Sequence, residues 1–117
     1  MEQQKSFSDA VAAYLAYAKA DYYNAWRGQN NFDVVVEKAG VKYTRVVHQE
    51  VYDGKVCHRS SHSFIVMADM VTAQGLRLKQ GDVLKCAGWK APALNFVRAN
   101  VFDESSYAGH VRWTGVS

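Results

Sequence analysis

Seven side chains in the C-terminal third of the chain combine the kinds of chemistry that hold a nucleotide. Aromatic rings stack on bases, an amide orients a base by hydrogen bonding, and lysine and arginine side chains bind phosphate. The predicted ligand-binding residues are Lys85, Trp89, Lys90, Asn95, Phe96, Arg98 and Arg112. A structural interpretation of the same segment stays open, in which Trp89 and Arg98 pin a helix to a sheet.

Most of these residues fall where a strand is predicted to run into a short helix that begins near Pro92. Proline is tolerated in a first helical turn, because its missing N–H would have no acceptor there. The other amides of that turn point outward, and with Lys90 beside them they form an anion site. Asn95 and Arg98 are three residues apart and share one face of this helix. The other, apolar face consists of Leu94, Val97 and Val101.

Basic charge is concentrated in the same part of the chain. Residues 77–100 hold five basic side chains against one acidic side chain, Asp82, which is a net charge of +4. The other nine basic and ten acidic residues sum to −1, so the formal net charge of +3 is local in origin. The basic side chains are Arg77, Lys79, Lys85, Lys90 and Arg98. This distribution indicates a site rather than a generally basic surface.

Other combinations of reactive residues give weaker evidence for a functional site. Cys57, His58 and His62 suggest a metal site, but structural zinc needs four ligands in compact pairs and no second pair is present. His62 and Ser63 could form a base and a nucleophile, but neighbouring residues on a strand point to opposite faces. The glycines are isolated and form no phosphate loop. We therefore expect a protein that is not an enzyme and that holds no metal or cofactor.

The elements that must position these residues begin with a long helix. Ser6 is the expected N-cap, Asp9 stands at the third helical position, and Gly28 is placed to end the helix. Apolar residues recur at spacings of three and four between these ends. They are Phe7, Val11, Tyr14, Leu15, Ala18, Tyr22, Ala25 and Trp26. A stripe so rich in aromatic rings suits packing on a sheet or on a second copy of the chain.

Beyond the helix the hydrophobic period changes to two, which indicates strands. Asp53-Gly54 between two alternating runs is a strong hairpin signal. Residues 69–81 are expected to be a loop that closes with the turn 79–82. The expected strands cover residues 32–37, 41–52, 64–67, 82–87 and 110–114. We predict one α+β domain, residues 1–117, in which a four- or five-stranded antiparallel sheet is covered by the N-terminal helix.

Composition is that of a folded domain, because 49% of the 117 residues are hydrophobic and 13% are aromatic. No apolar run is long enough to span a bilayer, so no membrane partner is expected. The N-terminal residues lack a basic-then-apolar signal pattern, which predicts a cytoplasmic protein. Cys57 and Cys86 fit that compartment as unpaired thiols, with a single disulfide as the alternative.

The C-terminal half, residues 62–115, resembles a group of small, mostly uncharacterised proteins encoded by tailed bacteriophages. Such proteins pair a His-Ser-Phe strand, here His62-Ser63-Phe64, with a Lys-x-x-x-Trp-Lys-Ala-Pro-Ala segment, here residues 85–93. Asn95, Arg98, Asn100 and the closing residues 111–115 continue the pattern. The stretch Asp21-Tyr-Tyr-Asn-Ala-Trp26 is similar as well. The resemblance implies a phage protein that acts in the cytoplasm of the infected bacterial host.

Small phage domains with a basic and aromatic site are similar to anti-defence proteins that sequester nucleotide immune signals, as in anti-Thoeris and anti-CBASS sponges. No binding residue is carried over from those proteins. The first hypothesis is thus a homo-oligomer, joined through the N-terminal helix, that captures a cyclic oligonucleotide or an ADP-ribose-type signal without cleaving it. Two alternatives are a single-stranded nucleic-acid-binding protein, which would use the same segment, and a protein that inhibits a host enzyme through its surface.

Overall fold

Helix α1 (Phe7–Ala25) opens the structure, a computed structural model that describes residues 6–25, 32–38, 41–112 and 114–116. Its N-cap is the predicted one, because Ser6 Oγ accepts a hydrogen bond of 3.1 Å from the Asp9 amide and the Ser6 carbonyl accepts one of 2.9 Å from Ala10. Trp26 and Gly28, expected at its C-terminal end, lie outside the described residues. The fully buried side of the helix consists of Ala10, Tyr14, Ala18 and Tyr22.

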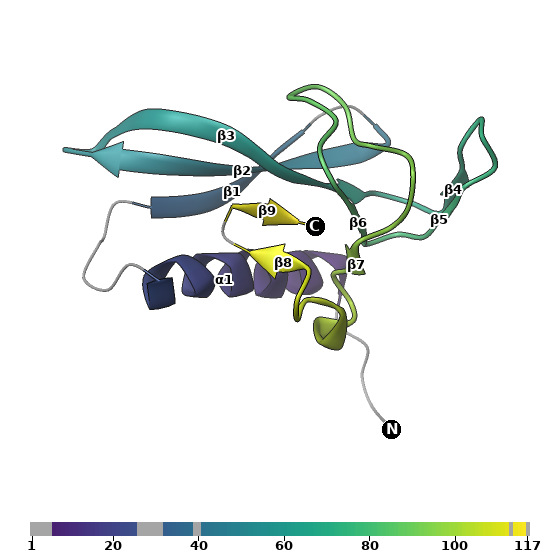
Figure 1. Cartoon of the computed structure of the whole chain (residues 1–117), viewed down its shortest axis with the longest axis horizontal. Helices are drawn as coiled ribbons and strands as arrows, with labels where there is room; N and C mark the ends of the chain where they lie inside the picture. The colour runs from purple at the N-terminus through teal and green to yellow at the C-terminus, as the bar shows by residue number, and fades with distance from the viewer. Residues whose placement is uncertain (1–5, 26–31, 39–40, 113, 117) are drawn as a thin grey trace.

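Five strands form one antiparallel sheet in the order β1-β2-β3-β6-β7. They are β1 (Phe32–Lys38), β2 (Tyr43–Tyr52), β3 (Lys55–Val66), β6 (Asp82–Leu84) and β7 (Ala99–Asn100). The predicted α+β class is confirmed, with α1 lying along one side of the sheet (Figure 1). The polar run from residue 57 to 63 is part of β3, which makes this strand longer than predicted.

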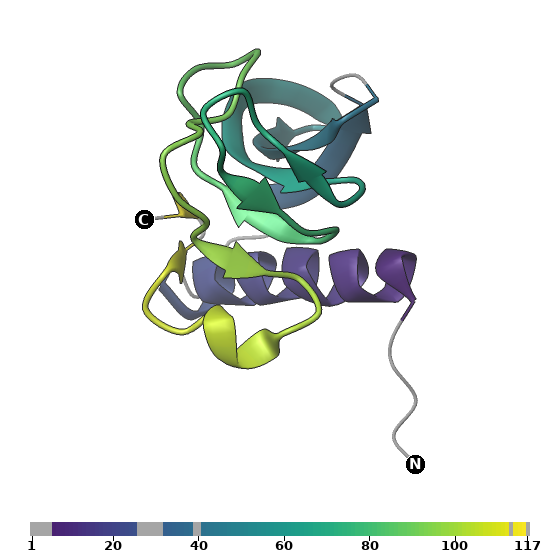
Figure 2. The ribbon, with the colours of Figure 1, turned by 90° about the vertical axis from the view of Figure 1, so that its right-hand side faces the viewer.

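The turn between β2 and β3 is the one that the sequence signal predicts. Asp53 and Gly54 both have positive φ angles, 52° and 75°, as the two central residues of a type I′ turn require. The right-handed twist of that turn matches the twist of its strands. In Figure 2 the sheet is strongly curled, with α1 on one side and the segment that joins β6 to β7 on the other.

The shorter elements differ from the prediction. The expected loop at 69–81 contains a small hairpin of β4 (Met70–Val71) and β5 (Arg77–Leu78), which extends from the body in Figure 1. The expected last strand is another hairpin, β8 (Val111–Arg112) with β9 (Gly115–Val116). The short helix expected to begin near Pro92 is absent, since residues 85–98 between β6 and β7 contain no helix; a 3-10 turn, η1 (Glu104–Ser106), follows β7 instead.

Two groups of buried apolar residues lie on the two sides of the sheet. On the helix side, Tyr14 of α1 packs with Val46 and Ile65 of the sheet. On the other side, Phe64 and Leu84 form a smaller cluster. Tyr14, Ala18 and Tyr22 of the predicted stripe are thus buried within the chain, whereas Phe7, Val11 and Leu15 are half-buried. Joining of two copies through this helix stays a prediction. Among the described residues, no helix is apolar enough over sufficient length to cross a membrane.

Candidate functional site: the Trp89 face

The segment between β6 and β7 is an extended loop and not the predicted helix. Its two arms pair, since the Ala93 amide donates to the Lys85 carbonyl at 2.7 Å and Cys86 forms a β-bridge with Pro92. The amides of Ala87 and Gly88 both donate to the Ala91 carbonyl and close the tip. Because the amide of Ala93 is bonded across the loop, it is not available for the anion site that we expected at a helix start.

Trp89 lies at the tip of this loop and rests on the face of the sheet opposite α1. Trp89 is 39% exposed as a residue, so it is a surface residue and not part of the core. The Arg45 guanidinium lies 4.5 Å from the ring centroid and the Arg59 guanidinium 5.6 Å from it. Arg45 Nε also donates to the Trp89 carbonyl at 3.1 Å. The ring is therefore fixed in place by arginines of β2 and β3.

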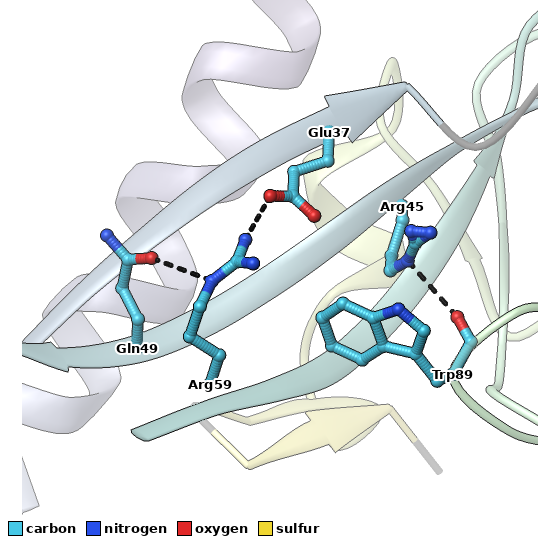
Figure 3. A network of polar contacts seen from close by, with 5 residues as sticks. All are labelled: Glu37, Arg45, Gln49, Arg59 and Trp89. Carbon is cyan, nitrogen blue, oxygen red and sulfur yellow. Dashed lines mark hydrogen bonds and ion pairs between the residues drawn. The ribbon is translucent and has the colours of Figure 1, made fainter. Parts of the chain in front are cut away.

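Arg59 is itself held by two neighbours (Figure 3). Its Nε donates to Gln49 Oε1 at 3.3 Å, and its Nη2 forms an ion pair with Glu37. These residues come from three adjacent strands, because Glu37 is on β1, Gln49 is opposite Arg59 on β2, and Arg59 is on β3. We call the surface of these five residues the Trp89 face; it consists of Glu37, Arg45, Gln49, Arg59 and Trp89.

Asn95, Phe96 and Arg98 form a second cluster on the same loop. Arg98 Nη2 donates to Asn95 Oδ1 at 3.2 Å, and the Arg98 guanidinium lies 3.7 Å from the centroid of the Phe96 ring. Phe96 is 54% exposed as a residue. The structure brings together the side chains that the predicted helix was meant to align, although no helix is present. Arg98 Nε is buried with no hydrogen-bond partner among the described residues.

The remaining predicted residues lie apart from these contacts. Lys85 is exposed at the base of the loop and Lys90 at its tip. Arg112 is on β8 beside α1, where its Nη1 lies 3.9 Å from Asp21 Oδ1. The structure does not bring Arg112 to the Trp89 region, because the C-terminal hairpin packs on the helix side of the sheet.

Sequence analysis missed Glu37, Arg45, Gln49 and Arg59. A signal for Arg45 was present, because it has the same strand parity as the apolar residues Tyr43 and Val47. A long charged side chain on the apolar face of a strand indicates that something polar or aromatic covers it. Here that cover is Trp89, which comes from a loop 44 residues further along the chain.

A β-bulge overturns the expectation for His62 and Ser63. The register passes from Val46 opposite Ser63 to Val47 opposite Ser61, so His62 is an extra residue in β3. Both His62 and Ser63 therefore turn toward α1. His62 Nδ1 lies 2.9 Å from Ser63 Oγ, and Tyr14 Oη lies 2.7 Å from the same oxygen.

The hydrogen-bond partners fix the tautomer of this cluster. The Arg112 carbonyl can only accept, so His62 Nε2, at 2.6 Å from it, carries the proton. Nδ1 is then an acceptor for the Ser63 hydroxyl, and Tyr14 donates to Ser63. Burial lowers the pKa of His62 to about 4, and burial raises the pKa of Tyr14 above its ordinary value.

This cluster has the contacts of a base and a nucleophile, but its position is that of a structural link. Ser63 is fully buried and His62 is 2% exposed, so a substrate has no access to either side chain. The cluster joins α1, β3 and the C-terminal hairpin. Within the part of the chain that the structure describes, no group of three or more His, Cys, Asp or Glu residues is placed to hold a metal ion. The side chain of Cys57, which the metal hypothesis included, is not among the described ones.

Comparisons with protein families, with curated proteins and with solved structures found no match to this chain.

Proposed function

We propose that the chain is a non-catalytic binding protein for a nucleotide-containing ligand, with the Trp89 face as its site. The observation that supports this is an exposed indole ring at a loop tip with two guanidinium groups 4.5 and 5.6 Å from its centroid. A base that stacks on the exposed part of such a ring would place its phosphate near Arg45 and Arg59. Arginine suits this role because its planar fork matches phosphate oxygens.

The biological role that we propose is sequestration of a nucleotide-derived immune signal, of the cyclic oligonucleotide or ADP-ribose type, by a phage protein in its bacterial host. The phage origin rests on the sequence resemblance alone. Sequestration, rather than cleavage, is proposed because none of the five residues of the Trp89 face is a nucleophile and its carboxylate, Glu37, is held in an ion pair with Arg59.

The test is binding of a panel of nucleotides by calorimetry, with recovery of the intact ligand from the heated complex. Trp89→Leu is expected to weaken binding about 5- to 150-fold, since stacking of a base on an aromatic side chain contributes about 1–3 kcal/mol. Tyr17→Leu is the matched control, because Tyr17 is 40% exposed but lies on α1, against Tyr107. Loss of affinity in both variants, or in neither, would contradict the proposal, as would recovery of a cleaved ligand.

The second candidate, binding of single-stranded nucleic acid, is favoured by the Phe96–Arg98 pair. That pair provides a second ring with a guanidinium beside it on the same loop, and successive bases of a strand need successive rings. Under this hypothesis, Phe96→Leu weakens binding of a mixed-sequence oligonucleotide and leaves mononucleotide binding unchanged. Oligonucleotide affinity would also fall steeply with added salt.

A further inference from the structure

The Trp89 face contains an acidic side chain that a simple phosphate site would not need. Glu37 forms an ion pair with Arg59, and the two side chains are 35% and 36% exposed. A ligand that approaches from solvent therefore meets the carboxylate together with the guanidinium. Glu37 also fixes the direction of the Arg59 fork, because it holds Nη2 while Gln49 holds Nε.

Glu37 changes the charge that the face offers to an anion. Arg45 and Arg59 carry two positive charges and Glu37 one negative charge, which leaves +1 on the five residues of the Trp89 face, with Lys90 exposed at the loop tip beside them. A phosphodiester carries one negative charge and would be balanced by this set. A terminal phosphate carries about −1.5 to −2 at neutral pH, so part of its charge would face the Glu37 carboxylate without compensation. Like charges brought together in a binding site reduce affinity and thereby select between ligands.

We propose that Glu37 makes the Trp89 face selective for nucleotides whose phosphate is a diester, as in a cyclic nucleotide or an internal linkage, over nucleotides with a terminal phosphate. This inference rests on the proposed function and narrows its ligand class. Cyclic oligonucleotides meet the requirement, since every phosphate in them is a diester. Nucleotides that end in a phosphate monoester do not.

The experiment compares two probes with one base and one phosphate each: adenosine 3′,5′-cyclic monophosphate, a diester, and adenosine 5′-monophosphate. The wild-type protein is expected to bind the cyclic probe more tightly. Glu37→Gln removes the charge and keeps an oxygen for Arg59, so affinity for the 5′-monophosphate should rise about five- to tenfold, with a smaller change for the cyclic probe. Asp33→Asn is the matched control, because Asp33 has the same parity on β1 but pairs with Lys19; both affinities should stay unchanged.

A second measurement uses the wild-type protein without any substitution. Acidification from about pH 7.5 to about pH 5.5 gives the 5′-monophosphate its second proton, whose pKa is about 6, so the preference for the cyclic probe should shrink. If Trp89→Leu abolishes binding of both probes while Glu37→Gln leaves their ratio unchanged, the inference is wrong and the binding site stands. If the wild-type protein binds neither probe nor any nucleotide of the panel, the proposed function fails, and this inference fails with it.

Discussion

Acidification is expected to destabilise the protein through His62, whose imidazole lies buried between α1, β3 and the C-terminal hairpin. In the folded protein, Nδ1 must accept a hydrogen bond from the Ser63 hydroxyl, because Nε2 carries the proton and donates to the Arg112 carbonyl. Protonation of Nδ1 would place a donor against the hydroxyls of Ser63 and Tyr14 and would put a charge in a dry interior. The folded protein therefore resists protonation of His62.

The size of the effect follows from the two pKa values. The pKa of His62 is about 6.5 in the unfolded chain and about 4 in the folded protein. Between these values the unfolded chain binds more protons, so the free energy of unfolding falls as the pH falls, and the fall ends near pH 4. At about 1.4 kcal/mol per pKa unit, His62 alone removes roughly 2–3 kcal/mol between neutral pH and about pH 4.5. Burial also lowers the pKa of His48, which acts in the same direction.

The assay is urea unfolding at several pH values for the wild-type protein and for His62→Gln. Glutamine can keep a donor toward the Arg112 carbonyl but does not titrate. Between neutral pH and about pH 4.5, the free energy of unfolding of this variant should therefore fall by roughly 2–3 kcal/mol less than that of the wild type. His58→Gln, at an exposed position on the same strand, should reproduce the wild-type slope. Parallel curves for wild type and His62→Gln would refute the assignment of a buried neutral histidine.

Two further predictions concern residues where β6 and β7 pair, Gly81 just before β6 and Asn100 in β7, and both are measured by chemical unfolding. Gly81→Ala should lower the free energy of unfolding by roughly 2–3 kcal/mol, because φ is +89° and a Cβ would lie 2.9 Å from the Phe102 ring. Gly75 has the same φ but open space around it. Gly75→Ala should therefore cost only the strain of the positive φ, about 1 kcal/mol. Asn100→Ala should cost roughly 1–3 kcal/mol, because its side chain donates to Asp82 Oδ1 at 2.9 Å and accepts from the Phe102 amide at 2.8 Å. Equal effects of the two glycine substitutions, or a neutral Asn100→Ala, would contradict these assignments.

The elements that sequence analysis predicted correctly are those whose signals are local. The Ser6 cap is recognisable within four residues, and the Asp53-Gly54 turn within two, since each depends on the conformation of the residues themselves. The bulge at His62 has no such signal. It places His62 against the Arg112 carbonyl, 50 residues away, so the partner that stabilises it is set by the tertiary structure.

The loop from 85 to 98 shows how a local signal can fit two structures. Pro92 suits a first helical turn, but it also suits an extended arm that offers no amide to a neighbour. The second structure is formed because the Ala93 amide reaches the Lys85 carbonyl and Leu94 and Val97 reach the apolar cluster of Phe64. The helix prediction could not include the contacts of Leu94 and Val97, because these depend on the position of Phe64 in β3.

Asn95, Phe96 and Arg98 lie together although the predicted helix is absent, and the reason is their chemistry rather than their spacing. Guanidinium groups stack on exposed rings in any backbone that allows contact, and Arg98 does so with Phe96 as Arg45 does with Trp89. The extended loop exposes the Trp89 and Phe96 rings to solvent just as a helix would. The extended loop adds what the helix could not provide, since only an extended arm carries Trp89 across to β2 and β3. The ring is thereby placed over arginines that are already oriented by Glu37 and Gln49, so a ligand would meet a preformed surface.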